Sequence, residues 1–325
     1  MEEEHDEQGD DAGRGRRGVR PGRSRGPRAV RADQGHGAEG RPGPAGAVGE
    51  GQGRRPGHHA GRGGVRRGQG EGAERRAERR LHTAGDSLTE PADALDRLGE
   101  QVSQCRACPR LVAWREQVAT EKRAAYADQT YWGRPVPGFG DPEPRILVVG
   151  LAPAAHGANR TGRVFTGDRS GDWLFSSLHR VGLAALPTST HRDDGQRLDG
   201  ARLVSAVRCA PPANKPTPAE RDTCASWLDR ELGLVLPHVE VVVTLGAFGW
   251  AAALAALERA GLDVPRPLPR FGHGVEVPLA DAEGRIRTLL GCYHPSPHNT
   301  VRGRLTEAMT DEVLGRARAL ARMPG

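Results

Sequence analysis

The chain has 325 residues, a formal net charge of +6 with a sequence pI near 9.5, and a mean hydropathy of −0.59. This length allows one or two domains, and the lack of a long apolar run predicts that the chain does not span a membrane. The basic balance permits a polyanionic partner without requiring one. The five cysteines are an odd number and no signal peptide is evident, which argues against a secreted disulfide scaffold. We therefore expect a cytoplasmic protein whose reduced thiols are available to a metal.

Residues 1–91 differ in composition from the rest of the chain. They are rich in Gly, Arg, Pro, Glu and Ala, and the first aromatic residue of the chain is Trp114. Such a segment cannot bury enough apolar surface to offset the entropy lost on ordering, so we predict a disordered tail. A basic arm that holds nucleic acid is one interpretation. We favour instead a solvated tail without a role, combined with a wrongly assigned start codon in a GC-rich genome. The folded domain is expected over residues 92–325.

Short apolar strands alternate with helices in this second part. Strands are expected at 146–149, 202–207, 239–245 and 287–291, and residues 131–140 read as a loop. Helices are expected from Ala92, over 170–181 with Ser170 as N-cap, from Thr217 to about Gly233, after Gly246, and from about Thr300 to Arg322. In the Thr217 helix, Pro218 and Glu220 complete a capping box. The alternation predicts a parallel sheet covered by helices on both faces.

A long polar loop follows the first expected strand and is the most informative stretch of the chain. It runs over residues 150–168 and is rich in Gly and in side chains that form hydrogen bonds. Polar loops with unusual Pro or Gly content also follow the second and fourth strands, around Asn214 and His294. Open α/β sheets bind ligands at the carboxyl ends of their strands. Three such loops at one sheet edge predict one site.

Four of the cysteines have a spacing that suits a metal site. Cys105 and Cys108 are close enough in sequence for both thiols to reach one metal, and Cys209 and Cys224 follow later in the chain. Four thiolates suit either zinc or an iron–sulfur cluster, and the spacing alone does not separate the two. Four inert buried thiols are the remaining alternative. Cys292 is expected to be a packing residue.

Three motifs together resemble the uracil-DNA glycosylase superfamily, and in particular its iron–sulfur branch known as type 5. The motifs are Gly150-Leu-Ala-Pro-Ala, the run from Asn159 to Asp168, and His294-Pro-Ser-Pro. The resemblance covers residues 93 to 320. It implies a three-layer α/β/α sandwich with a central four-stranded parallel sheet. It also implies a [4Fe–4S] cluster on Cys105, Cys108, Cys209 and Cys224, with zinc as the alternative.

The same resemblance implies an enzyme that flips a deaminated base out of double-stranded DNA and hydrolyses its N-glycosidic bond. Phe165 would stack on the base, with core packing as the alternative role. Asp168 would orient the attacking water, because Ala152 replaces the acid found in many members of the superfamily. Asp172 is the second choice, although its place near a helix start explains it better. His294 would donate a hydrogen bond to the base as charge develops there.

The remaining expected contacts are to the base edge and to the DNA backbone. Asn214 and Asn299 would contact the base or its surroundings, and main-chain groups of Gly150 and Ala152 would contribute to the pocket. The loop that contains His298 resembles the family's intercalating loop, although a Leu is usual at that position. The expected phosphate contacts are Arg160, Arg163, Lys215, Arg302 and Arg304.

We therefore expect a monomeric hydrolase that removes uracil and other deaminated bases from DNA. Hypoxanthine is expected among its substrates, with xanthine and ethenocytosine as further candidates. The alternative is a non-catalytic iron–sulfur protein that binds nucleic acid and senses damage. A small-molecule α/β hydrolase is a weaker third hypothesis, because the chain has no Gly-x-Ser-x-Gly motif.

Overall fold

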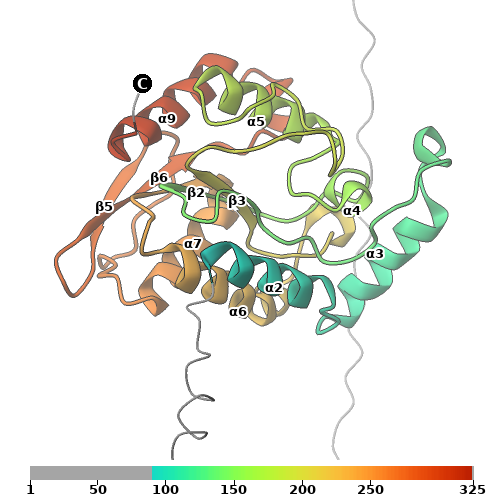
Figure 1. Cartoon of the computed structure of the whole chain (residues 1–325), viewed down its shortest axis with the longest axis horizontal. Coiled ribbons are helices and arrows are strands. Elements are labelled where there is room, and N and C mark those ends of the chain that lie inside the picture. The colour runs from blue at the N-terminus through green and yellow to red at the C-terminus, as the bar shows by residue number, and fades with distance from the viewer. Residues whose placement is uncertain (1–89, 324–325) are drawn as a thin grey trace, which may run out of the picture. The chain divides into compact units, whose positions relative to one another are not determined.

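A mixed β-sheet forms the centre of residues 90–323, which are the residues that the computed structural model describes. Nearly all of the predicted tail, residues 1–89, lies outside the described range. The strands follow the order β1-β3-β2-β4-β6-β5 across one six-stranded sheet (Figure 1). They are β1 (Phe139–Gly140), β2 (Ile146–Gly150), β3 (Ala201–Ser205), β4 (Val241–Leu245), β5 (Glu276–Ala280) and β6 (Ile286–Cys292).

The four central strands are parallel, as the sequence predicts. Strand β2 pairs with β3 on one side and β4 on the other, and β4 pairs with β6. Every residue of β2, β3 and β4 is buried, and most of these residues are apolar; the exceptions are Arg202 and Ser205 in β3 and Thr244 in β4. Because the four strands run in the same direction, the loops that follow β2, β3 and β6 begin at the same edge of the sheet.

Helices cover both faces of the sheet, so the expected three-layer arrangement is confirmed (Figure 1). Helices α5 and α9 lie over one face, and α2, α6 and α7 lie over the other. The helices are α2 (Pro91–Ser103), α3 (Pro109–Glu121), α4 (Ala158–Thr161), α5 (Arg169–Arg180), α6 (Pro218–Val235), α7 (Gly246–Arg259), α8 (Pro297–Thr300) and α9 (Glu307–Leu320); η1 (Ala124–Tyr126) and η2 (Pro212–Asn214) are 3-10 turns.

The sheet has a hydrophobic core on each face, and successive side chains of β2 point alternately into one core and the other. Ile146 and Val148 pack with α5 and α9, whereas Leu147 and Val149 pack with α6 and α7. The capping box predicted at the start of α6 is present, with the Thr217 hydroxyl accepting from the Glu220 N–H and the Glu220 carboxylate accepting from the Thr217 N–H.

The structure corrects the expected sheet and two helix boundaries. Strands β1 and β5 are antiparallel edge strands that the sequence analysis missed, because β1 has only two residues and β5 is not an apolar run. Asp168, not Ser170, is the N-cap of α5. The single helix expected from Thr300 is split into α8 and α9, and a new cap at Thr306 starts α9. Helix α3 was also missed.

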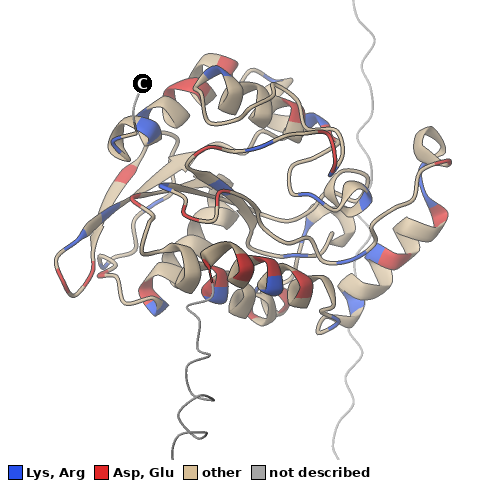
Figure 2. Cartoon of the chain, viewed as in Figure 1, with Lys and Arg blue, Asp and Glu red and all other residues tan. Residues whose placement is uncertain are grey.

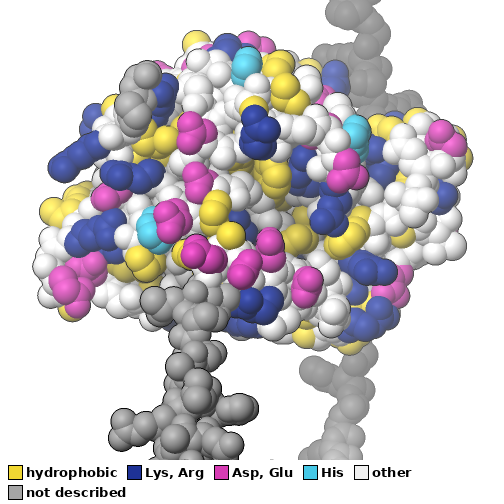
Figure 3. Space-filling view, viewed as in Figure 1, with side chains coloured by type: hydrophobic (Ala, Val, Ile, Leu, Met, Phe, Trp, Pro, Cys, Tyr) yellow, Lys and Arg dark blue, Asp and Glu magenta, His cyan; other side chains and the backbone are white. Residues whose placement is uncertain are grey.

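Charged side chains occur on the helices of both layers. Acidic residues are frequent on α2 and α6, the helices under the sheet (Figure 2). The space-filling view shows Lys and Arg side chains both over the side of the domain where α3 and α4 lie and over the opposite side (Figure 3). None of the helices in residues 90–323 combines the length and apolarity that a bilayer crossing requires.

Candidate active site

The three polar loops meet around one cavity of about 480 Å³ at the carboxyl edge of the parallel strands. Its walls include Ala152, Phe165 and Asp168 from the loop after β2, Asn214 from the segment after β3, and His294 from the loop after β6. The cavity is within the size range of small-molecule sites in proteins. The structure therefore brings the three predicted loops together around one cavity. Sequence reasoning missed Pro153, Ser205 and Ser296, which also line the cavity.

The Phe165 ring is held in the cavity wall by a strained backbone and two glycines. Phe165 has a φ of +51°, a conformation that costs energy for a residue with a side chain. A Cβ added to Gly150 would lie 2.6 Å from the ring, and one added to Gly171 would lie 2.1 Å from the Phe165 carbonyl oxygen. The ring centroid of Phe165 is 6.3 Å from that of His294. A flat apolar surface therefore faces the cavity beside an imidazole.

Gly150 does not occupy the position that the sequence analysis assigned to it. It is buried at the end of β2, and its carbonyl oxygen accepts a hydrogen bond from the Ala206 N–H at 3.0 Å. Its carbonyl oxygen is thus occupied, and Gly150 does not line the cavity. Gly150 instead leaves the space in which the Phe165 ring lies, because any side chain there would displace the ring.

Asp168 combines two roles in one carboxylate. Its Oδ1 accepts hydrogen bonds from the N–H groups of Ser170 and Gly171, at 2.9 and 3.0 Å, and so caps α5. Its Oδ2 lies against Gly157, where an added Cβ would be 1.8 Å away, and accepts no hydrogen bond from residues 90–323. Burial raises the pKa of Asp168 above its usual value, although the two N–H groups oppose this shift. One oxygen of a fixed carboxylate is therefore left to bind a water or a ligand.

His294 is electrically neutral at neutral pH. Burial lowers the pKa of its imidazole to about 4, so that the ring can donate a hydrogen bond without carrying a charge. Asn299 fixes this loop, because its Nδ2 donates to the His294 carbonyl oxygen at 2.8 Å. Asn299 does not line the cavity, so its predicted contact with the base or its surroundings stays a prediction.

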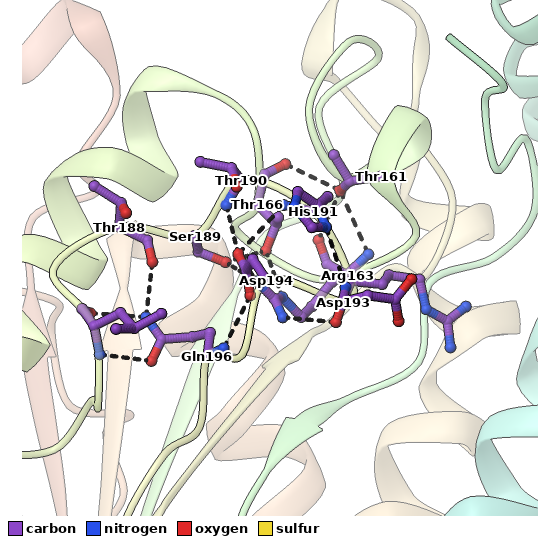
Figure 4. A network of polar contacts seen from close by, with 12 residues as sticks. Thr161, Arg163, Thr166, Thr188, Ser189, Thr190, His191, Asp193, Asp194 and Gln196 are labelled. Carbon is purple, nitrogen blue, oxygen red and sulfur yellow. Dashed lines mark hydrogen bonds and ion pairs between the residues drawn. The ribbon is translucent and has the colours of Figure 1, made fainter.

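Arg163 is not a surface residue, so its predicted phosphate contact is wrong. Its side chain is 5% exposed, and its guanidinium donates to Asp194 at 2.5 Å and to Ser189 at 2.6 Å (Figure 4). This contact holds the pKa of Asp194 well below its usual range. Figure 4 shows Arg163 and Asp194 pointing toward one another from the loop after β2 and the loop before β3. Arg163 therefore fastens these two loops together.

The Arg163→Met variant is expected to lose about 3–5 kcal/mol of unfolding free energy, because it leaves the Asp194 carboxylate buried without its partner. Arg180→Met is the matched control: its pair with Asp311 is about one third exposed, and its removal should cost at most about 1 kcal/mol. Urea unfolding of both variants measures the difference. Equal losses would show that the buried pair has no special weight.

The other predicted DNA contacts have different surroundings. Lys215, His298, Arg302 and Arg304 are exposed and form no ion pair within residues 90–323. Arg160 is half-buried, and its guanidinium donates to the carbonyl oxygens of His156 and Gly167 and to Gln129. Arg160 therefore braces the loop after β2, with its N–H groups largely occupied, whereas the other four are available to a ligand.

Cys105, Cys108, Cys209 and Cys224 line one small cavity, away from the base-sized one. Cys209 and Cys224 are buried, and burial raises the pKa of Cys209 to about 12. The Arg115 guanidinium donates to the Cys209 sulfur at 2.9 Å, and the Arg208 N–H donates to the Cys224 sulfur at 3.3 Å. The structure thus brings together the four thiols that the sequence analysis grouped.

Two buried arginines line the same cavity and were missed by the sequence analysis. Arg115 is 2% exposed and Arg208 is 1% exposed. The Nε atoms of both, and Nη1 of Arg208, have no hydrogen-bond partner within residues 90–323. Glu231 pairs with Arg208 and also with Arg202, at 2.6 and 2.7 Å, so this triad keeps one positive charge. Buried donors without partners are costly. Together with the positive charge, they make the cavity suited to an anionic group held by the four sulfurs.

Comparison with known proteins identifies the family to which this chain belongs. The family model of the uracil DNA glycosylase superfamily matches residues 137–318. The chain is 54% identical over 230 residues to a type-5 uracil-DNA glycosylase of Mycobacterium tuberculosis, covering 71% of this chain and 83% of that protein. It is 53% identical over 234 residues to one of Mycobacterium leprae (72% and 99%) and 52% identical over 222 residues to one of Thermus thermophilus (68% and 96%). The chain belongs to the type-5 uracil-DNA glycosylase family.

Proposed function

We propose that this protein is a hydrolase that removes uracil from DNA by cleaving the N-glycosidic bond. The observation that carries the proposal is the convergence of Phe165, Asp168, Asn214 and His294 on one cavity of about 480 Å³. This cavity offers a flat surface for a flipped base, a neutral donor and a carboxylate with one free oxygen. Flipping is required because the bond to be cleaved is not accessible within the base stack.

The proposed reaction uses each of these groups at a defined atom. The bond between the base and the sugar breaks, and its electron pair leaves with the base. The neutral His294 donates a hydrogen bond to the base oxygen that gains charge and keeps its own proton. Asp168 Oδ2 accepts the proton of the water whose oxygen bonds to the sugar carbon. The departing base takes its proton from solvent.

Excision should depend on pH in a way that separates the two groups. Because the pKa of Asp168 is raised, the rate should fall on acidification at a pH above the ordinary Asp value. The neutral form of His294 persists down to about pH 4, so His294→Gln should lower the rate by about 10²-fold without moving this acid limb. Single-turnover rates between pH 4 and 8 measure both effects. An acid limb that shifts in His294→Gln would assign it to the imidazole.

His294 also predicts how stability depends on pH. Its folded-state pKa of about 4 lies below the ordinary value of 6.5, so the unfolded chain binds more protons between these values. Its contribution is complete above pH 6.5 and is lost as the pH falls toward 4. His294→Gln should therefore flatten the loss of thermal stability in this window, and an unchanged profile would contradict the assignment.

We also propose that the site accepts hypoxanthine and other deaminated bases. The support is the apolar wall beside the ring, which Ala152 and Pro153 line; the resemblance implies an acid at the position of Ala152 in many members of the superfamily. A small apolar wall does not select one base edge by hydrogen bonding, and hydrophobic pockets discriminate weakly against added groups. Duplexes with a single uracil, hypoxanthine, xanthine or ethenocytosine test this range. Cleavage of the uracil duplex alone would contradict this proposed substrate range.

We also propose that the four cysteines hold a [4Fe–4S] cluster, with zinc as the alternative. Thiolates around one zinc lie about 2.3 Å from the metal and hence about 3.8 Å from one another. The four sulfurs share one cavity with the two buried cations Arg115 and Arg208. A multi-iron cluster holds its thiolates farther apart than one ion does. When bound, it would tie the segment between α2 and α3 to β3 and α6.

The decisive experiment uses the purified full chain and a labelled duplex with uracil opposite guanine. Alkali-labile breaks at the uracil are the expected result, and they should depend on Asp168. DNA binding by an iron-containing protein without any cleavage would favour the alternative, a damage-sensing protein without catalysis. The observation that favours this alternative is the cavity lined by four thiols, which could hold a metal without any role in catalysis.

A further inference from the structure

Two exposed arginines outside the base cavity lack a carboxylate partner, which about half of the arginines in residues 90–323 have. Arginines elsewhere in residues 90–323 are commonly held by a carboxylate, as Arg259 is by Asp229 at 2.7 Å and Arg316 is by Glu276 at 2.7 Å. Arg134 and Arg192, in contrast, are exposed and form no ion pair within the same residues. Neither was among the phosphate contacts predicted from sequence. Their charge is therefore available to a ligand.

Both guanidinium groups lie over one tryptophan in a surface hollow of about 430 Å³. The guanidinium Cζ atoms of Arg134 and Arg192 lie 5.5 and 4.6 Å from the centroid of the Trp132 ring. The indole is itself fixed, because its N–H donates to the Pro135 carbonyl oxygen at 3.0 Å and Gly162 packs against the ring, where an added Cβ would be 2.8 Å away. Stacking on a fixed ring reduces the freedom that the two cations lose on binding an anion.

This hollow continues toward the base cavity. An adjoining cavity of about 370 Å³ shares Asp168, Arg169 and Asn214 with the base cavity, and Tyr126 forms part of its wall. The Arg160 guanidinium lies 4.0 Å from the centroid of the Tyr126 ring and lines the hollow around Trp132 on its other side. The three spaces therefore follow one another along the surface from Asp168 to Arg192.

The charge of the hollow favours an anion. Arg134, Arg160 and Arg192 line it against the single carboxylate of Asp193. We propose that the hollow around Trp132 binds backbone phosphates of the DNA strand that flanks the flipped nucleotide. A base is not the expected occupant, because the guanidinium groups already cover the indole. The inference rests on the proposed function and extends it to a phosphate site separate from the loop that carries His298.

The test compares the salt dependence of DNA binding in matched variants of the full chain. The double variant Arg134→Gln and Arg192→Gln should lower the slope of log K against log salt by about 1.8, because two phosphate contacts are lost. The corresponding double Lys variant keeps the charge and should retain most of the slope. Arg230→Gln is the control: Arg230 is exposed and lies 4.9 Å from the Trp227 ring, outside the hollow, and its slope should be unchanged. Fluorescence anisotropy with a uracil-containing duplex measures all four proteins.

The outcomes separate this inference from the proposed function. An unchanged slope in the Gln double variant, while the wild-type chain excises uracil, overturns the phosphate site and leaves the glycosylase intact. Equal losses in the Gln and Lys variants would indicate disturbed structure and would also overturn it, as would an equal loss in Arg230→Gln. A wild-type chain that excises nothing removes the proposed function and, with it, this inference.

Discussion

Asp168→Asn should lower the single-turnover rate of uracil excision by about 10²–10⁴-fold, the usual contribution of a positioned general base. Asn is a good N-cap and can keep the contacts of Oδ1 with Ser170 and Gly171, so the start of α5 should persist. What the substitution removes is the proton acceptor at the second oxygen. The rate loss is therefore expected at nearly wild-type stability.

Two further variants make the result specific. Asp168→Ala removes the cap as well, and it should lose about 1 kcal/mol of unfolding free energy in addition to the activity. Asp172→Asn is the control. Asp172 lies in the first turn of the same helix, and burial raises the pKa of its carboxyl too. It does not line the base cavity, so its excision rate should stay within a few-fold of wild type. A larger loss in Asp172→Asn than in Asp168→Asn would reverse the assignment of the two carboxylates.

The proposed cluster predicts that Cys209→Ser loses its metal and most of the stability of the domain. Structural metal sites with thiolate ligands contribute about 10–16 kcal/mol of binding free energy in zinc peptides, which is comparable with the whole stability of an ordinary domain. Cys209 is buried with the Arg115 guanidinium on its sulfur, so loss of the metal would leave that cation without its anion. Metal and acid-labile sulfide per chain, together with thermal unfolding, measure the effect.

Cys292→Ala is the matched control for this experiment. Cys292 is fully buried at the end of β6, and burial raises the pKa of its thiol to about 12. It does not line the cavity of the four cysteines. The variant should keep its full metal content and lose only a modest packing contribution. Zinc without sulfide in the wild-type protein would contradict the cluster, and equal metal loss in both variants would contradict the ligand set.

Local patterns predicted the parts of the fold that depend on neighbouring residues. Strands β2, β3 and β4 are buried along their whole length, and apolar runs such as Ile146–Val149 mark them in the sequence. The start of α6 was predicted to the residue, because Thr217 and Glu220 satisfy each other's backbone N–H groups locally. The edge strands β1 and β5 were missed since only pairing with β3 and β6 makes them strands.

The same distinction applies to the site. The sequence alone determined that polar loops follow three parallel strands, and parallel strands bring such loops to one edge, so Phe165, Asp168, Asn214 and His294 were found together. It could not distinguish Arg163 from Arg160, which lie three positions apart in one loop. Only the fold places Asp194 against Arg163, and burial of that pair removes Arg163 from the surface.

Tertiary structure also decided the protonation state of His294, because burial sets its pKa, and it assembled the hollow around Trp132 from Arg134 and Arg192. The physical reason is common to these cases. Periodicity and capping are properties of adjacent residues and can be seen in the sequence. Burial and ion pairing depend on which distant segments the fold brings together.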